Sequence, residues 1–322
     1  MDHIISLQVL YHIIFYPAYI SQIHRGKKGM KSIILIVADS LRYDTYKQVL
    51  EKINIPYHDF DGFNSCNSCT ELSLPWMLSG MEIYSPNMNI PRDLEKKGYK
   101  TTLIHSNPIV HRFSGCFQET IDLAKKQKLY KFTKKYNRLR NFIEKHFPEL
   151  YNNIKTHIRG TEETYLPYTR IYDTLPHITR DNPRFTWVHL MDPHTPYYPV
   201  ETQLTYRETL DLNNHQMSAV RGYYQPKLCE VQSWYEEYKQ ECMESLSFLV
   251  DWLEIVNYDN TVIIFTSDHG EEFGEHGEYG HKGNRFNPEN TRVPFVVIGH
   301  DLPECSFMDH SHLREYIKRL TK

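Results

Sequence analysis

Two apolar runs, far apart in the chain, each lead into acidic residues. Residues 32–38 (SIILIVA) end at Asp39, and residues 261–265 (TVIIF) are followed within three positions by Asp268 and then His269. Neither run has a helical period, and short uninterrupted apolar runs are typical of strands covered on both faces of a parallel sheet. The chain is therefore predicted to fold around a buried sheet whose strands present acidic groups at their carboxyl ends.

Asp39, Asp268 and His269 suit a metal better than a packed core. In open α/β sheets, ligands bind at the carboxyl edge of the strands, where these side chains would meet. Two carboxylates and an imidazole are ligands of zinc and of other divalent transition ions. The alternatives are structural: Asp268 and His269 could form a surface turn before an acidic helix, and Asp39 could cap a helix over residues 44–53.

The pattern along the rest of the chain predicts an α/β fold. Predicted helices cover residues 91–97 and 228–256, and predicted strands cover residues 99–105, 184–190 and 292–298. With 322 residues, of which 40% are hydrophobic, the chain can bury a large core. The length permits two domains, and we favour one large unit.

Residues 1–30 are predicted to form a helical segment ahead of a main domain that covers residues 31–322. Residues 4–23 carry no charged side chain, and several basic residues follow at once. A helix packed on the domain is the first interpretation, and an interfacial helix at a membrane surface is the second. A membrane span, which needs about 20 apolar residues, is the third, and residues such as Gln8 and Pro17 argue against it.

Charge and cysteine content bear on partners and compartment. The net charge of −3 gives no reason to expect a nucleic-acid partner, although residues 125–140 are strongly basic. That segment is predicted to form a solvated helix face, with a groove for an anionic substrate as the alternative. Cys66 and Cys69 have the spacing of a redox or zinc pair but lack a second pair, so a loop or a disulfide is expected. Because no cleavable signal peptide is evident and the six cysteines are scattered, we predict a cytoplasmic protein, with peripheral membrane association as the alternative.

Thr70 is the candidate nucleophile. It precedes a predicted helix that tolerates Pro75 in an early turn and ends at Gly80. A hydroxyl at the start of a helix faces free backbone N–H groups, a setting that holds phosphate. A metal bound to that oxygen would lower its pKa and allow it to attack. The alternative is a threonine that only caps the helix.

Six separated motifs occur in order along the chain. They are D-S-L-R-Y-D (39–44), T-E-L-S-L-P-W-M-L-S-G (70–80), H-L-M-D-P-H-T-P-Y-Y-P (189–199), S-D-H-G-E-E-F-G-E-H-G (267–277), G-H-K-G (280–283) and R-V-P-F-V-V-I (292–298). Together they resemble the sulfatase-like branch of the alkaline phosphatase superfamily, over about residues 31–298. The resemblance implies a three-layer α/β/α sandwich with a mostly parallel central sheet, here with a reduced C-terminal part.

The resemblance also implies roles for individual residues. Four residues match the primary metal ligands of the family, the second of them being also the nucleophile: Asp39, Thr70, Asp268 and His269. Two residues match catalytic positions that contact the transferred anionic group or a second metal: His194 and His281. Three further residues are candidates for substrate binding: His189, Lys282 and Arg42. For Arg42 the alternative is that it stabilises the loop that follows residues 32–38 and does not contact the substrate.

The nucleophile motif departs from that of true sulfatases. Those enzymes resemble C-x-P-S-R at this place, where the Cys or Ser is oxidised to formylglycine, whereas residues 70–74 read T-E-L-S-L. Threonine cannot become formylglycine because its β-carbon carries a methyl group. The Thr nucleophile and the Asp-His pair are similar to those of the phosphoethanolamine and phosphoglycerol transferases of cell envelopes. The nitrogen ligand indicates zinc first, with manganese or calcium as alternatives.

The predicted function is cleavage of a phosphate ester or diester by a metal-dependent hydrolase or transferase that forms a covalent phospho-threonine at Thr70. The substrate would be a small-molecule, glycan or lipid-headgroup ester. The alternatives are a sulfatase that uses an unmodified Thr and a non-catalytic binding protein that keeps the fold. Several other histidines are expected to be structural or solvent-exposed, among them His105, His111, His310 and His312.

Overall fold

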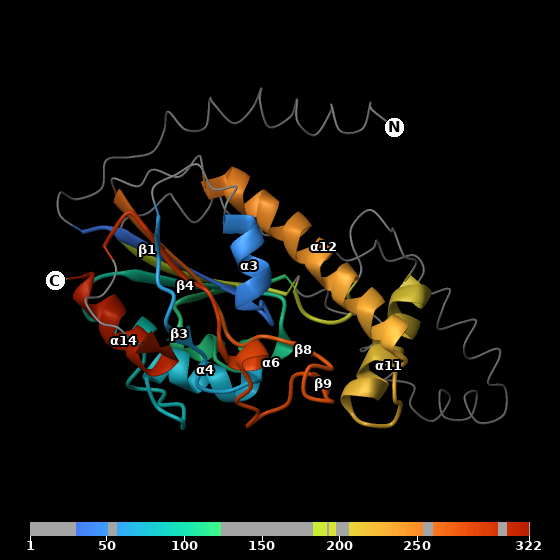
Figure 1. The fold of residues 1–322 in the computed structure, drawn as a ribbon. Helices are drawn as coiled ribbons and strands as arrows, with labels where there is room; N and C mark the ends of the chain where they lie inside the picture. The colour runs from blue at the N-terminus through green and yellow to red at the C-terminus, as the bar shows by residue number, and fades with distance from the viewer. Residues whose placement is uncertain are drawn as a thin grey trace, which may run out of the picture.

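A seven-stranded sheet forms the centre of the protein (Figure 1). The computed structural model describes residues 30–50, 57–123, 183–191, 193–197, 206–253, 260–301 and 308–321. The strands lie in the order β2 (His58–Asp59), β10 (Phe295–Ile298), β7 (Thr261–Ser267), β1 (Ser32–Ala38), β6 (Arg184–Leu190), β4 (Lys100–His105) and β5 (Glu119–Asp122). The five strands from β7 to β5 are parallel, whereas β10 is antiparallel to β7 and β2 to β10. The prediction of a mostly parallel sheet is confirmed.

Strand β1 shows why the apolar runs do not alternate with polar residues. Ile33 pairs with Phe185 of β6 on one side and with Val262 of β7 on the other. Successive side chains of β1 enter different cores on the two faces of the sheet, with Ile34 in one core and Leu35 in the other. Because both faces are buried, no position of this strand favours a charged side chain.

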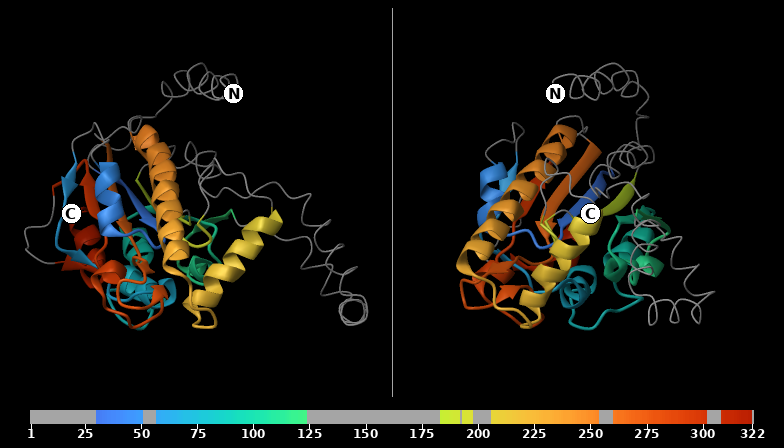
Figure 2. Two further views of the ribbon diagram at one scale, coloured as in Figure 1. Left: turned by 45° about the vertical axis from the view of Figure 1, so that its right-hand side comes forward. Right: turned by 90° about the vertical axis from the view of Figure 1, so that its right-hand side faces the viewer.

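Helices cover both faces of the sheet. One face is covered by α3 (Tyr43–Leu50) and α12 (Leu228–Leu253), with Ala219 of α11 (Tyr206–Val220) in the same core. The other face is covered by α4 (Thr70–Ser79), α5 (Ile90–Glu95), α6 (Pro108–His111) and α14 (His310–Arg319). Figures 1 and 2 show α12 and α4 on opposite sides of the sheet. The predicted three-layer α/β/α sandwich is therefore confirmed.

Shorter elements complete the described fold. Strands β8 (Glu272–Phe273) and β9 (Tyr279–Gly280) form an antiparallel pair, and β3 (Phe63–Asn64) pairs in parallel with β11 (Met308–Asp309). The remaining elements are α13 (Pro288–Thr291) and a 3-10 turn at Ser114–Cys116. The β8–β9 pair lies in the chain directly after the Asp268 motif, and the β11–α14 segment follows the last strand of the main sheet.

The bounds of several elements follow from single residues. The helix that was predicted to close at Gly80 ends at Ser79, and Gly80 has the left-handed φ of 71° while its N–H donates to the Trp76 carbonyl. The strand predicted over residues 292–298 begins only at Phe295, because Pro294 lacks the N–H that a sheet ladder requires. The strands predicted over residues 32–38 and 184–190 coincide with β1 and β6.

Some predictions fall outside the described residues. These are the helical segment 1–30 with its uncharged residues 4–23, of which only residue 30 is described, and the basic segment 125–140. Within the ranges that the structure describes, no helix combines the length and the apolarity that crossing a bilayer requires.

Candidate metal and nucleophile site

The ends of β1 and β7 bring the two predicted acidic residues together. Ala38 pairs with Ser267 in these adjacent parallel strands, so Asp39 and Asp268 follow at the same edge of the sheet. Both carboxylates and the His269 ring are fully buried. The three side chains that were expected to meet at this edge thus lie together in the structure.

Asp39 is surrounded by hydrogen-bonding groups. His189 Nε2 lies 3.1 Å from Asp39 Oδ2, and Asn107 Nδ2 donates to the same oxygen over 2.9 Å. The Ser40 hydroxyl donates to Asp39 Oδ1 over 3.2 Å. Burial alone would raise the pKa of Asp39, but the surrounding histidines hold it far below its ordinary value. The carboxylate is therefore charged and able to act as a ligand.

The His269 ring gives the strongest indication of a cation. Its Nδ1 lies 2.8 Å from the Gly270 carbonyl, which can only accept, so Nδ1 carries the proton. Burial lowers the pKa of His269, which keeps the ring neutral and leaves a lone pair on Nε2. Nε2 nevertheless faces carboxylate oxygens of Asp39 and Asp268, each at 3.5 Å. The Nε2 lone pair and the two carboxylates are all acceptors, so they cannot form hydrogen bonds with one another. A divalent cation between them would bind all three.

Asp268 supports the same conclusion. Its Oδ1 accepts from the backbone N–H groups of Ser40 at 3.2 Å and His269 at 2.9 Å. Its Oδ2 is buried and has no hydrogen-bond partner among the described residues. Ligand atoms of Asp39, His189 and Asp268 all lie within 4.8 Å of one another. Because a buried carboxylate oxygen without a partner is costly, these residues fit a bound divalent ion.

Thr70 is the first residue of α4, and its hydroxyl points into the same site. Oγ1 lies 3.2 Å from His269 Nε2 and 3.4 Å from Asp39 Oδ2. Cys69 occupies the N-cap position and makes no capping hydrogen bond with its side chain. A threonine that only caps the helix is therefore not what the structure contains. Thr70 is 3% exposed, so its oxygen is dehydrated and close to the predicted ligands.

Two backbone positions shape this edge of the sheet. Gly270 has no room for a side chain, since an added Cβ would lie 2.0 Å from the Glu289 carbonyl oxygen. Ser40 has a positive φ of 63°, which is costly for a residue other than glycine. This conformation directs the Ser40 N–H to Asp268 and its hydroxyl to Asp39. The strained position of Ser40 thus holds the two carboxylates in place.

His194 and His281, the predicted contacts of the transferred group, lie against the same cluster. Their ring centroids are 5.0 Å apart, and the His281 centroid lies 4.3 Å from that of His269. His281 Nδ1 is 3.2 Å from both carboxylate oxygens of Glu271. Burial would lower the pKa of His281, but Glu271 raises it to about 9. His281 is therefore a paired cation beside the candidate metal ligands.

The three predicted substrate contacts lie in three different environments. His189 is fully buried and lies among the candidate metal ligands. Lys282 is exposed. Arg42 is buried, and its guanidinium pairs with Asp44 at 2.7 Å and with Glu275 at 2.5 Å. This pairing supports the alternative in which Arg42 stabilises the loop that follows β1.

Three residues that contact the site were not found from the sequence. They are Ser40, Asn107 and Glu271. Asn107 follows β4 and directly precedes Pro108, which is the sequence signal of a helix N-cap at a strand end, and this signal could have identified it. Ser40 and Glu271 carry no comparable signal, because their roles depend on neighbours that only the fold supplies.

Comparisons with known sequences identify a family. A model of the family described as Sulfatase matches residues 31–310. Over 44 residues the chain is 48% identical to the multifunctional alkaline phosphatase superfamily protein PehA of Trinickia caryophylli. This match covers 14% of the chain and 8% of that relative, so the chain aligns with only a small part of it.

Solved structures share the fold. The C-terminal periplasmic domain of EcEptC from Escherichia coli, in complex with Zn, is 14% identical with a TM-score of 0.62, over 92% of this chain and 84% of that chain. The phosphonate monoester hydrolase of Agrobacterium radiobacter is 16% identical with a TM-score of 0.58, over 90% of this chain and 73% of that chain. These likenesses confirm the predicted alkaline-phosphatase-like architecture.

The prediction of a cytoplasmic location is wrong. The similar structures include C-terminal periplasmic domains, one of them from a phosphoethanolamine transferase, and this finding contradicts the cytoplasmic prediction. The prediction relied on scattered cysteines and on the lack of an evident cleavable signal, and neither is a physical barrier to export. Cys66 and Cys69 are free thiols, so the disulfide considered for them is not formed.

The family match covers most of the chain and includes every predicted site residue. The expected class, a hydrolase or transferase of this superfamily, is confirmed at the level of the family. We conclude that the chain belongs to the sulfatase family, within the alkaline phosphatase superfamily.

Proposed function

We propose that this protein is a metal-dependent enzyme that hydrolyses or transfers a phosphate ester or diester through a covalent phospho-threonine at Thr70. The observation that carries the proposal is the position of Thr70 Oγ1, 3.2 Å from His269 Nε2 and 3.4 Å from Asp39 Oδ2. A hydroxyl among metal ligands is the arrangement of an activated nucleophile. We assign the activity to the domain predicted over residues 31–322.

Four buried groups would hold the metal: Asp39, Thr70, Asp268 and His269. Zinc is the first candidate because the set includes an imidazole nitrogen, and manganese and calcium are the alternatives. The zinc complex of the Escherichia coli domain, which has the same fold, supports this order. When bound, the ion would lower the pKa of the Thr70 hydroxyl and screen the carboxylates from an anionic substrate.

In the proposed reaction, Thr70 Oγ1 forms a bond to phosphorus while the bond from phosphorus to the leaving oxygen breaks. His194 and His281 would donate hydrogen bonds to the non-bridging oxygens of the transferred group. Glu271, at 3.2 Å, keeps the His281 ring in place. Water or an acceptor hydroxyl then attacks phosphorus and releases the group from Thr70. The choice between these two acceptors separates a hydrolase from a transferase.

The names of the relatives support a phosphorus-containing substrate. The Agrobacterium radiobacter enzyme is a phosphonate monoester hydrolase, and a structurally similar Campylobacter jejuni domain belongs to a phosphoethanolamine transferase. The substrate of this chain would be a small-molecule, glycan or lipid-headgroup ester. His189 would orient Asp39, which it contacts at 3.1 Å, and exposed Lys282 would meet the substrate. Membrane association through residues 4–23 stays a prediction.

A substrate panel with the zinc-loaded protein tests the proposal. We expect turnover of a bis-aryl phosphate and of an aryl phosphate, and loss of both activities in Thr70→Ala. Mass spectrometry of the acid-quenched wild-type protein should find one phosphoryl group on Thr70 after reaction with the aryl phosphate, and one aryl-phosphoryl group after reaction with the bis-aryl phosphate. Undiminished turnover in Thr70→Ala would remove the covalent mechanism, and a preference for an aryl sulfate would favour the sulfatase alternative.

Thr101→Ala is the matched control for this experiment. Thr101 is as buried as Thr70. It lies near the start of β4, at the end of the strand away from the site, where its hydroxyl donates to Glu95 over 2.8 Å. We expect its turnover to stay near that of the wild type. A wild-type protein that binds no divalent metal and shows no turnover with zinc, manganese or calcium would favour the non-catalytic alternative.

A further inference from the structure

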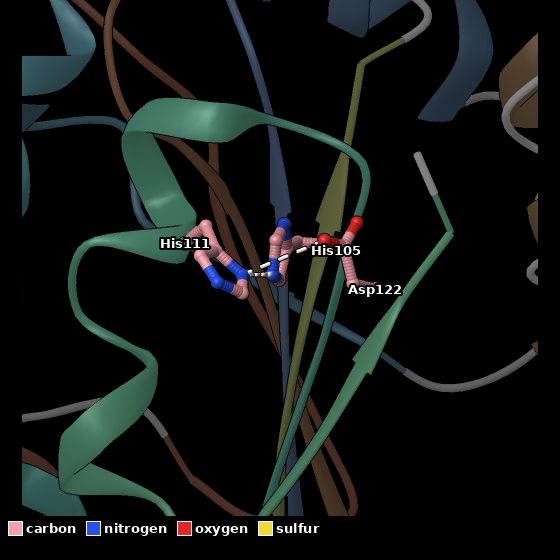
Figure 3. A group of neighbouring side chains, drawn as sticks. All are labelled: His105, His111 and Asp122. Carbon is pink, nitrogen blue, oxygen red and sulfur yellow. Dashed lines mark hydrogen bonds and ion pairs between the residues drawn. The ribbon is translucent and has the colours of Figure 1, made fainter. Parts of the chain in front are cut away.

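A second group of metal-ligating side chains lies farther along the same edge of the sheet. His105 ends β4, Asp122 ends β5, and His111 ends helix α6, which follows β4. Figure 3 shows the two imidazole rings close together, with the Asp122 carboxylate beside them. None of these residues has a part in the proposed reaction. The sequence indicated only structural or solvent-exposed roles for the two histidines.

The ligand atoms are separated by distances that suit a metal. His111 Nδ1 is 3.3 Å from His105 Nε2 and 3.5 Å from Asp122 Oδ2, and all three atoms lie within 4.8 Å of one another. Hydrogen bonds of N–H groups are usually shorter, at about 2.9–3.0 Å. Ligands bound tetrahedrally at about 2.0–2.1 Å stand about 3.3–3.4 Å apart. The two short separations agree better with ligands around a common ion.

Burial and charge point the same way. His105 is fully buried, where a charged ring would be costly, so its Nε2 is able to offer a lone pair. The side chains of His111 and Asp122 are 55% and 28% exposed, which leaves one side of the group open to water. Two imidazole nitrogens and one carboxylate, with an open position, form a common ligand set for zinc outside purely structural sites.

We propose that His105, His111 and Asp122 form a second divalent-metal site, with three protein ligands and a fourth position open to solvent. The ligand set suits zinc and the other late transition ions that prefer imidazole nitrogen. The inference does not rest on the proposed function, because it concerns metal binding by residues outside the reaction.

The loop between β4 and α6 connects this site with the first. His105 pairs in register with His189 of β6, the residue that contacts Asp39. Asn107, two residues after His105, donates to Asp39 Oδ2 over 2.9 Å. An ion that binds both His105 and His111 holds both ends of the segment formed by this loop and α6, and with it the Asn107 side chain. The second ion therefore has a positioning role toward the first site.

The zinc content of the full chain tests the proposal. The protein is stripped with a chelator, reloaded with zinc, desalted and subjected to elemental analysis. We expect two zinc ions per wild-type chain, one in His111→Ala and one in Asp268→Asn. His215→Ala is the matched control and should keep both ions, since His215 is also about half exposed and its Nε2 also lies near a carboxylate, that of Glu230 at 3.1 Å.

A second variant and a folding check complete the test. Asp122→Ala should lose the same ion as His111→Ala, because it removes the only carboxylate among the three proposed ligands. His111 is exposed, so His111→Ala should melt at the wild-type temperature in the absence of metal. Zinc contents equal to that of the wild type in both variants would overturn the proposal and leave the three residues as a hydrogen-bonded group.

Discussion

The candidate metal and nucleophile site and the His105, His111 and Asp122 group lie at one edge of the same sheet but at different depths. Asp39 and Asp268 follow the central strands β1 and β7 and are fully buried. Asp122 is the last residue of β5, the outermost described strand on its side of the sheet, and its side chain is 28% exposed. A strand with neighbours on both sides ends under loops from both, whereas an edge strand ends at the surface.

This difference in depth has chemical consequences. Charges interact more strongly in a buried site than in water, so the central site is suited to stabilising charge that develops during a reaction. An exposed site exchanges its ligands with water and is suited to holding an ion that positions a loop. The comparison predicts large effects on catalysis for changes at the central strands and smaller ones for changes toward the surface.

The largest effect is expected for Thr70→Ala. Removal of a nucleophile should lower kcat/KM by on the order of 10⁶-fold, because the covalent step is lost. His111→Ala, in the more exposed group of His105, His111 and Asp122, should lower kcat/KM by no more than about 10-fold. Steady-state kinetics on a bis-aryl phosphate measures both. Equal losses of kcat/KM in the two variants would contradict the comparison, because catalysis would then depend equally on the buried site and on the more exposed His105, His111 and Asp122 group.

Next in size is a pH effect from His310, which lies behind the end of β7. Its Nε2 is 3.0 Å from the Ser267 carbonyl, and burial lowers the pKa of its ring to about 4, below the ordinary 6.5. In the unfolded chain the His310 ring becomes protonated below about pH 6.5, whereas in the folded protein it stays neutral until about pH 4. The free energy of unfolding should therefore fall as pH drops through this window, by up to about 3 kcal/mol.

The variant His310→Gln isolates this contribution. Chelator-treated protein is unfolded with urea at pH 7 and at pH 4.5, and the decrease in the free energy of unfolding should be smaller in the variant than in the wild type. His300→Gln is the control, because His300 is exposed whereas His310 is fully buried. An unchanged decrease in His310→Gln would show that the buried ring is not the source.

A smaller loss is expected for Asn107→Ala, the residue between the two sites. Loss of its hydrogen bond to Asp39 should weaken zinc binding at the first site by about 10–100-fold, as measured by competition with a chelator. Asn89→Ala is a matched control: Asn89 is also buried and also accepts a capping hydrogen bond, from Arg92 N, at the start of α5. It should cost about 1 kcal/mol of stability and leave zinc affinity unchanged. Equal affinities in the two variants would contradict the positioning role.

The smallest effect is expected for Lys282→Ala. Lys282 is exposed, so a contact with an anionic substrate is screened by water and salt. We expect KM to rise by about 2–5-fold with kcat unchanged, and the rise to shrink at high salt. Lys96→Ala, which removes another exposed lysine, should leave KM unchanged. A decrease in kcat instead would show that Lys282 contributes to the chemical step and not only to substrate binding.

Much of the fold and of the central site was predictable from the sequence. The run SIILIVA is apolar at nearly every position because both faces of β1 are buried, and that pattern is local in the chain. Asp39 and Asp268 were predictable as neighbours because parallel strands present their carboxyl ends at one edge. Ser40 and Glu271 were not, since a serine with positive φ and one glutamate within an acidic run have no distinctive pattern.

The sequence by itself determined five of the seven strands of the main sheet, the helix that closes at Gly80, and the acidic residues that follow β1 and β7. Only the tertiary structure decided which strands are neighbours and how deeply each end is buried. Strand order depends on contacts between distant segments, which local periodicity does not encode. For this reason Asp268 and His269 were found from the chain alone, whereas the meeting of His105, His111 and Asp122 required the strand order β6, β4, β5 and the position of His111 beside His105.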